Sequence, residues 1–371
     1  MKLFVDASRN RSGGAIEYLI GVFNSNSVKN FDGEIHIYAP KKVLSQLPDN
    51  PKALVKRSSW MIENNLMWQL LWQLIVAPLI LYREKFDMLF STDASTVTFF
   101  KRHVVMSQDM LSYEDGIMDL YPPGLRKVRL RLIYYLQNFA FKRARGTIFL
   151  TQYASNKIQE HCGKVNNFTV IPHGIHGQIR APLIPEMKNI EQGINIVFVS
   201  NAAPYKNQWT VIEATDLVRS KGFNVKLTLV GGGEGPAQQR TKETMNTIDP
   251  SGEFIKQFGY LMRREVQAIV SKSHIYVFAS SCENLPITLL EGMSFGLPIV
   301  SSNRGPMPEV LQGGGLYFDP DDASTLATVI ISTIVNDAER IARQEESFCL
   351  SQNYTWQRTA RETLEYLVNL N

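Results

Sequence analysis

Hydrophobic and polar positions follow a repeating order along the chain, in which short apolar runs of strand length alternate with longer amphipathic stretches. In the first half the predicted strands are KLFVDA, EIHIYA, MLFST, HVVMSQ, TIFLT and FTVIP. In the second half they are INIVFVS, VKLTLVG, FIKQFG, HIYVFAS and PIVSS. Alternation of strand and helix is typical of parallel sheets covered on both faces. The pattern therefore predicts an α/β protein with doubly wound sheets.

A break in this alternation divides the chain. The segment from His173 to Gly193 has three glycines, two prolines and no periodicity, which is typical of a linker. At 371 residues the chain is also too long for one ordinary core. We therefore predict Rossmann-like domains over residues 1–178 and 179–352, and a last helix over residues 353–371 that packs back on the first domain. His173 is expected in the linker and on the floor of the cleft between the domains.

One apolar stretch, from Leu66 to Tyr82, is nearly long enough to be a membrane-spanning helix. It is uncharged, but Pro78 interrupts it, and Gln69 and Gln73 lie one turn apart on one face. A spanning helix needs about 20 residues that are apolar all round. We therefore predict a buried or interfacial amphipathic helix. The start, MKLFVDASRN, has no apolar core of signal-peptide length, and three widely spaced cysteines fit a reducing compartment, so we expect a cytoplasmic protein.

The segment SSCENLPITLLEGMSFGLPIV places two glutamates around a predicted helix start. Glu283 precedes the helix, Asn284 is a good N-cap, and Pro286 falls in the first turn, where its missing N–H has no cost. Glu291 lies on a later turn of the same helix. Each glutamate alone is explained equally well by solvation or by the helix dipole.

The helix start follows a buried strand, and ligands bind at the carboxyl ends of strands in open α/β sheets. The N–H groups of Leu285 and Thr288 would point out of this end, where a helix N-terminus favours anions. Thr288 and Glu291 share a face of the helix. Glu291 can therefore accept hydroxyls from a vicinal diol such as a ribose, and Glu283 is placed for a second hydroxyl-bearing group.

Three further segments lie where a predicted strand is followed by a loop and then a predicted helix. VSNAAPYKNQ places Lys206 at a strand end, where it could neutralise a diphosphate. LVGGGEGP is a weak phosphate signal and more typical of a tight turn. RNRSGGAIEYL puts Gly13 and Gly14 before a helix, where backbone could approach a phosphate or simply turn. A solvated lysine and two turns are the simpler interpretations.

The net charge of +4 is unevenly distributed. From Tyr121 to Gln159 there are eight Lys and Arg and no Asp or Glu, and the first cluster comprises Arg126, Lys127 and Arg129. This composition indicates an anionic neighbour: nucleic acid, phosphates or membrane headgroups. A core helix with solvated charged ends is the alternative.

Taken together, these segments resemble a known family. Glu283 and Glu291, with seven residues between them, are similar to the E-x7-E motif of retaining glycosyltransferase family four, which has the GT-B fold of two Rossmann-like domains. The double glycine, FVSNAAPYKN, LVGGGEGP, LPIVSSNRGPMPEVL and GLYFDPDD agree with it. SQDMLSYE and GTIFLTQYA are most similar to members that build bacterial O-antigen or capsular polysaccharides, several of them mannosyl- or deoxyhexosyltransferases.

The resemblance implies a set of site residues. Glu291 would bind the ribose of a GDP- or UDP-linked sugar and Glu283 the hydroxyls of the transferred sugar, while Lys206 and the helix start take the diphosphate and Gly14 approaches from the first domain. The implied catalytic residues are Glu283, Lys206 and Asp109, and the implied donor-binding residues are Gly13, Gly14, Asn201, Asn284, Leu285, Thr288 and Glu291.

The chain departs from the family pattern at two positions. Asn201 stands where many members have arginine, so Arg9, Arg11 or Arg304 could supply the missing charge. Gln108 stands where many have histidine, which leaves the adjacent Asp109 to contact the sugar or acceptor hydroxyl; a helix N-cap is its alternative role.

A metal-binding D-x-D is not convincing, because Asp319-Pro-Asp321 falls in a segment that the family uses structurally. The resemblance therefore implies no cofactor and no metal, with lysine and helix dipole stabilising the leaving diphosphate.

We therefore expect a retaining hexosyltransferase that acts on a glycan or lipid-linked acceptor in bacterial surface polysaccharide synthesis. The basic helix would contact an anionic membrane peripherally. A nucleotide-sugar 2-epimerase and a non-catalytic partner of an active transferase remain alternatives. Nucleic-acid binding is disfavoured, because the basic stretch has no recognised module.

Overall fold

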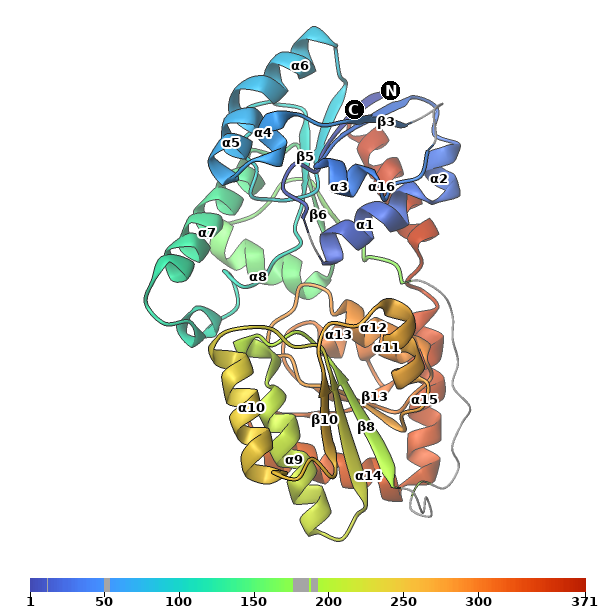
Figure 1. Ribbon diagram of the computed structural model, residues 1–371. Helices are drawn as coiled ribbons and strands as arrows, with labels where there is room; N and C mark the ends of the chain where they lie inside the picture. Colours follow the sequence, from blue (N-terminus) through green and yellow to red (C-terminus); the bar gives the residue numbers. More distant parts are fainter. Residues whose placement is uncertain (12, 50–53, 176–186, 188–192) are drawn as a thin grey trace. The chain divides into compact units, whose positions relative to one another are not determined.

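The computed structural model describes residues 1–11, 13–49, 54–175, 187 and 193–371 (Figure 1). The contacts divide the chain into two compact units. The first unit is Met1–His176 with Tyr354–Asn371, and the second unit is Gly177–Asn353. The sequence placed this division after residues 178 and 352, and most of the predicted linker lies outside the described residues.

The first unit contains a seven-stranded parallel sheet in the order β3-β2-β1-β4-β5-β6-β7. The strand order reverses direction between β1 and β4, which is the switch point of a doubly wound sheet. The strands are β1 (Lys2–Asp6), β2 (Glu34–Tyr38), β3 (Leu54–Arg57), β4 (Met88–Ser91), β5 (His103–Met106), β6 (Gly146–Phe149) and β7 (Phe168–Val170).

Helices connect these strands and cover the sheet. They are α1 (Gly14–Phe23), α2 (Asn26–Lys29), α3 (Lys41–Leu44), α4 (Trp60–Glu63), α5 (Leu66–Leu71), the π-helical η1 (Trp72–Val76), α6 (Ala77–Arg83), the 3-10 helix η2 (Ile117–Leu120), α7 (Leu125–Arg143), α8 (Gln152–Cys162) and the C-terminal α16 (Trp356–Asn369).

The second unit repeats the design with a six-stranded parallel sheet in the order β10-β9-β8-β11-β12-β13. Its switch point lies between β8 and β11. The strands are β8 (Ile194–Val199), β9 (Val225–Val230), β10 (Ile255–Phe258), β11 (Ile275–Phe278), β12 (Ile299–Ser302) and β13 (Gly315–Phe318). The helices are the 3-10 helix η3 (Pro204–Lys206), α9 (Gln208–Ser220), α10 (Pro236–Ile248), α11 (Arg263–Val270), α12 (Ile287–Ser294), α13 (Met307–Leu311), α14 (Ala323–Val335) and α15 (Asp337–Ser351).

All eleven strands predicted from the sequence form, and the fold prediction of two doubly wound sheets is confirmed. Two strands, β3 and β13, were missed. Both lie at the edge of their sheet and are only partly buried. An edge strand has a partner on one side only, so LVKR of β3 needs no continuous apolar run, whereas GLYF of β13 is apolar but only four residues long.

The apolar stretch after Leu66 is helical through α5, η1 and α6. Its inner face belongs to the core, because Trp72 and Leu81 are buried beside Phe4 and Tyr38. In the described part of the chain it is the one helix long and apolar enough to span a bilayer, and 28% of it is buried. The stretch therefore has one face in the core and an outer face with exposed apolar side chains, and is less polar on that outer face than the predicted amphipathic helix.

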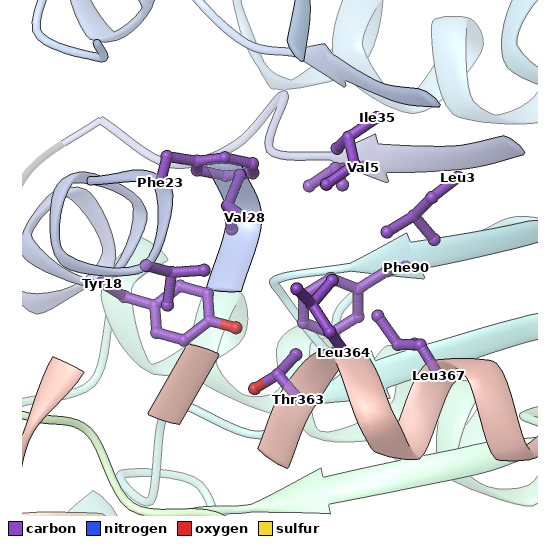
Figure 2. A pocket seen from close by; sticks show the side chains of 11 residues that line it. Leu3, Val5, Tyr18, Phe23, Val28, Ile35, Phe90, Thr363, Leu364 and Leu367 are labelled. Atoms are coloured by element: carbon purple, nitrogen blue, oxygen red, sulfur yellow. The ribbon is translucent and has the colours of Figure 1, made fainter. Parts of the chain in front are cut away.

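The C-terminal helix α16 packs on α1 and α2 of the first unit. In Figure 2, Thr363, Leu364 and Leu367 of this helix face Leu3 and Phe90 of the sheet across a cavity of only about 10 Å³. Such close packing leaves no room for an ordered cluster of water. The last segment of the chain is therefore part of the first unit's core.

His173 is buried in this same packing. Its ring lies 4.9 Å from that of Tyr18 and 5.7 Å from that of Trp356, measured between centroids. Burial lowers the pKa of His173 to about 3, so the ring is neutral. The ring is an aromatic filler between α1 and α16, inside the first unit.

Gly174 is the point at which this packing allows no side chain. A Cβ built there would lie 2.1 Å from the backbone nitrogen of Trp356 and 2.4 Å from the carbonyl carbon of Thr355. Since backbone atoms cannot rotate away, Gly174→Ala should lower the free energy of unfolding by about 1–3 kcal/mol. Denaturant unfolding measures the change.

The matched control is Gly259→Ala, because no atom lies within 4 Å of a Cβ at that position. Equal stabilities of the Gly174→Ala and Gly259→Ala variants would contradict the close approach of the chain at Gly174.

Candidate functional site

Two loops meet at the switch point of the second unit, one after β8 and one after β11. The N–H of Ser281 donates to the carbonyl of Tyr205 at 2.8 Å, and Nδ2 of Asn207 donates to the carbonyl of Ala279 at 3.0 Å. Asn207 has a left-handed backbone (φ 52°), which asparagine tolerates better than most residues. These bonds hold the two loops in a fixed relation.

Lys206 and Glu283 are brought together by these loops. Lys206 Nζ forms an ion pair with Glu283 Oε1, and the two side chains are only 12% and 15% exposed. A partly buried ion pair compensates charges that would be costly to bury alone. The structure thus joins two residues that are 77 positions apart in the sequence.

The helix after β11 begins later than the sequence predicted. α12 starts at Ile287, with Pro286 at the N-cap and no side-chain cap, so the prediction of Asn284 as N-cap is wrong. The residue before a proline avoids the helical region, which excludes Leu285 from the helix. Asn284 and Leu285 are instead buried in the loop beside Glu283.

Thr288 and Glu291 lie on α12, above a buried tyrosine of β11. The hydroxyl of Tyr276 donates to the carbonyl of Thr288 at 2.8 Å. Burial, and secondarily the charge of Glu291, raises the pKa of Tyr276. A Cβ at Gly292 would lie 2.9 Å from the Tyr276 ring, so glycine lets the helix approach the strand closely.

Arg263 is a site residue that the sequence reasoning missed. Its Nη2 lies 3.0 Å from Glu291 Oε1, and both side chains are about one third exposed. Arg263 opens α11, whereas Glu291 is on α12, so the pair joins two successive strand-helix units. No local spacing signals such a pair. Only the parallel order of the strands brings these helices together.

The glycine segment after β9 acts mainly as a turn. Gly231 has φ +100°, and a Cβ there would lie 2.3 Å from the carbonyl oxygen of Ser200. The neighbouring carbonyl of Gly232 accepts the N–H of Ala202 at 3.1 Å. The segment therefore supports the loop that carries the exposed Asn201, as the simpler interpretation of the sequence predicted.

The three arginines considered as replacements at Asn201 all have other partners. Arg304 binds both Asp319 and Asp321, at 2.8 and 3.1 Å. Arg9 pairs with Asp93, and Arg11 donates to backbone carbonyls at the end of α4. The carboxylates with D-x-D spacing are thus held by an arginine.

In the first unit, Asp109 follows β5 but does not cap a helix. Its Oδ1 accepts the N–H of Leu111 at 3.0 Å and closes a turn. Burial, together with the nearby charge of Asp93, raises the pKa of Asp109, and the bond from Leu111 opposes this shift. Gln108 donates to the carbonyl of Thr92 at 2.8 Å and ties this turn to the loop after β4.

Gly13 and Gly14 lie where β1 is followed by α1. Gly13 is the N-cap with φ 63°, and Gly14 is the first helical residue. No atom lies within 4 Å of a Cβ built at Gly13, so the left-handed backbone, rather than crowding, requires glycine there. Gly13 is exposed at this helix start.

The fold and the arrangement at the second switch point define a GT-B protein, built from two Rossmann-like units. Residues 182–347, most of the second unit, match the family described as "Glycosyl transferases group 1". The match lies within the second unit and covers less than half of the chain, and the family resemblance inferred from the sequence is confirmed.

Relatives and solved structures agree with this assignment. Over 111 residues the chain is 25% identical to the O-antigen chain mannosyltransferase B of Escherichia coli, which covers 30% of this chain and 29% of the relative. Over 158 residues it is 24% identical to the amylovoran biosynthesis glycosyltransferase AmsK of Erwinia amylovora, covering 40% and 38%. These matches span less than two fifths of either relative.

Anabaena HepE, solved in complex with UDP-glucose, has the same fold throughout. It superposes with a TM-score of 0.72 at 18% identity, over 100% of both chains. At this identity the likeness establishes the fold alone.

Asp109 leads to a prediction about stability and pH. A carboxyl whose pKa is raised by folding binds more protons in the folded than in the unfolded state, so its contribution to stability falls as the pH rises through that interval. Asp109→Asn removes this loss and keeps an oxygen for the Leu111 N–H. The free energy of unfolding should therefore be higher for the variant at pH 7 and converge with the wild type in acid.

Denaturant unfolding across this pH range is the measurement, with the exposed Asp216→Asn as the matched control. A variant that is less stable than the wild type at pH 7 would show that the Asp109 charge stabilises the fold.

Proposed function

We propose that the protein is a retaining glycosyltransferase that moves a hexosyl unit from a nucleotide sugar to a glycan or lipid-linked acceptor. The observation that carries this proposal is the Lys206–Glu283 ion pair at the β8–β11 switch point, together with the Arg263–Glu291 pair on the helices before and after β11, in a segment that matches the glycosyl transferases group 1. This is the edge of a parallel sheet at which nucleotides bind.

Each group has a proposed role toward the donor. The Glu291 carboxylate accepts hydrogen bonds from the ribose diol, and Arg263 keeps it oriented. Glu283 accepts hydroxyls of the transferred sugar, with the backbone of Asn284 and Leu285 beside it. The N-terminal end of α12, near Thr288, faces the diphosphate.

Lys206 supplies positive charge for the leaving diphosphate. In the proposed reaction the acceptor oxygen forms a bond to the anomeric carbon on the face from which the phosphate oxygen departs. The acceptor proton passes to that phosphate oxygen, and the configuration is retained. Charge grows on the diphosphate as the bond breaks, so a fixed ammonium and a helix N-terminus stabilise the transition state more than the ground state.

The proposed acceptor side lies in the first unit. Asp109 is proposed to contact an acceptor or sugar hydroxyl, and Gly13 and Gly14 to leave backbone accessible to a phosphate. Relatives named for O-antigen and amylovoran synthesis favour a role in bacterial surface polysaccharide synthesis, with a mannosyl or deoxyhexosyl donor as one option. A lipid-linked acceptor would place the protein at the cytoplasmic face of a membrane, in peripheral contact through basic α7.

Glu291→Ala tests the ribose contact. Loss of the carboxylate leaves the diol hydroxyls without an acceptor, which should weaken nucleotide-sugar binding by about 1–3 kcal/mol. Calorimetry with GDP- and UDP-sugars measures the change. Glu243→Ala is the matched control, since Glu243 is an exposed carboxylate on α10 of the same unit. Equal donor affinity in both variants would refute the assignment.

Lys206→Ala tests the charge on the leaving group. The rate of sugar transfer (kcat) should fall by about 10²-fold or more, as when other transition-state stabilisers are removed. Lys221→Ala, at the end of α9, should leave kcat unchanged.

Transfer by the wild type should also survive excess EDTA, because the proposed charge stabilisation comes from Lys206 and α12. Loss of transfer in EDTA that Mg²⁺ or Mn²⁺ restores would overturn this part of the mechanism.

A further inference from the structure

Helix α7 carries an apolar stripe on the side that faces solvent. The stripe follows spacings of three and four residues, which is the repeat of one face of a helix. Its members are 39% to 90% exposed and comprise Leu125, Val128, Leu132, Tyr135 and Phe139. A solvated helix face normally carries polar residues, so this stripe indicates a surface that is covered by something apolar.

The opposite side of α7 is the one that packs on the first unit. Its buried residues are Leu130, Gln137, Ala140 and Phe141. At 3.6 residues per turn, Leu130, Gln137 and Phe141 lie about half a turn from the stripe. The buried face thus includes a glutamine while the exposed face is apolar. Because the buried residues lie on the opposite side of the helix, the exposed apolar stripe is a separate face and not the edge of the buried one.

A second apolar surface is formed by the outer face of α5, η1 and α6. Between Asn65 and Tyr82 the sequence has no charged residue. Met67, Ile75, Leu79 and Tyr82 are 55% to 66% exposed. With its inner face on the core, this helix also presents apolar side chains to solvent along its length.

Aromatic contacts join the two surfaces. Tyr82 of α6 lies 5.5 Å from Phe100, measured between ring centroids, and the adjacent Phe99 lies 6.0 Å from Phe139 of α7. The Arg143 guanidinium lies over both Phe99 and Phe139, at 4.9 and 5.1 Å. Figure 1 shows α5, α6 and α7 along the same side of the first unit. The α7 stripe and the exposed apolar residues of α5, η1 and α6 together form one apolar surface, which we call the outer face.

Cations border the outer face along α7. Arg129, Arg131 and Lys142 are exposed and have no ion pair among the residues that the structure describes. By contrast, Lys127 is paired with Asp119 at 2.8 Å, and Arg126 lies over the ring of Tyr121. The cluster that the sequence singled out is thus partly engaged within the protein, and the free cations lie beside the apolar stripe.

We propose that the outer face inserts into the interfacial region of an anionic lipid bilayer. Apolar side chains of α5, η1, α6 and α7 enter the acyl boundary, while Arg129, Arg131 and Lys142 reach lipid phosphates. This inference rests on the peripheral membrane contact in the proposed function and makes it more specific. Instead of charge attraction alone, two helical segments on the protein surface insert apolar side chains into the bilayer.

Charge decides between a bilayer and a second copy of the chain. In a helix pair built on the α7 stripe, the residues beside the seam would be Arg129 and Arg131 of both copies. No acidic residue lies between Tyr121 and Gln159, and the nearby Asp119 is already paired with Lys127. Like charges would therefore face each other across a dimer, whereas a layer of anionic phosphates complements them.

Vesicle co-sedimentation tests this inference. The probes are vesicles of phosphatidylcholine alone and of phosphatidylcholine mixed with phosphatidylglycerol. The wild type should bind the anionic vesicles, and part of the binding should remain at high salt, because insertion of apolar groups is not screened. Release of all bound protein by salt would overturn insertion.

Two double variants remove apolar area from the outer face. Ile75→Gln with Leu79→Gln, and Val128→Gln with Leu132→Gln, should each lower the partition coefficient by about tenfold or more, given the transfer free energy of two aliphatic side chains. The matched control is Leu217→Gln with Val335→Gln, two exposed aliphatic residues of the second unit, which should leave binding unchanged. Equal binding by control and outer-face variants would refute the surface.

Tryptophan emission gives an independent readout. Trp60, next to α5, has an exposed ring and stacks edge-on against Trp68. Bromine-labelled lipids should quench emission of the wild type more than that of Trp60→Phe, and equal quenching would contradict insertion near α5.

Calorimetry and ultracentrifugation separate this proposal from the others. Nucleotide-sugar binding should be intact in the outer-face variants, because none of the proposed donor residues lies on α5, η1, α6 or α7. Vesicle binding without any donor binding would refute the proposed function and leave the membrane surface standing. A wild-type dimer that Leu132→Gln dissociates would instead assign the stripe to a second copy and overturn the proposal.

Discussion

The parallel pairing of β8 with β11 is the contact on which the candidate site of the second unit depends. Because the strand order reverses there, the loops that leave the two strands turn to opposite faces of the sheet and open a space between them. The hydrogen bonds from the Ser281 N–H to the Tyr205 carbonyl and from the Asn207 side-chain amide to the Ala279 carbonyl then fix how far apart the loops are. The strand pairing therefore sets the backbone positions from which the side chains of these loops extend.

The same strand order determines which segments contribute the Lys206–Glu283 and Arg263–Glu291 ion pairs. Lys206 and Glu283 come from the two strands at the reversal, whereas Arg263 and Glu291 come from helices that precede and follow β11. Each carboxylate is held by a cation before any ligand arrives. A ligand therefore meets charges that are already oriented, which lowers the reorganisation that binding requires.

Most of the fold was predictable because its signals are local. Buried strands are continuous apolar runs, and the loop glycines mark real turns. What the sequence did not reveal depends on contacts between distant segments. Arg263 finds Glu291 only through the sheet order, and His173 is a packed ring only because α16 returns to cover it. The start of α12 was misplaced by cap propensity, where the restriction before Pro286 has the larger effect.

The second unit is, in terms of chain path, an insertion into the first. The chain leaves the first unit just after Ile175 and re-enters it at Tyr354, and the N–H of Ile175 donates to the Tyr354 carbonyl at 3.0 Å. The two ends of the inserted segment are thus fastened together. A segment whose two ends lie together can be exchanged between related chains without changes to the flanking parts of the first unit. Recombination at these two junctions would replace the second unit, which carries the residues proposed to bind the donor, while leaving the first unit intact.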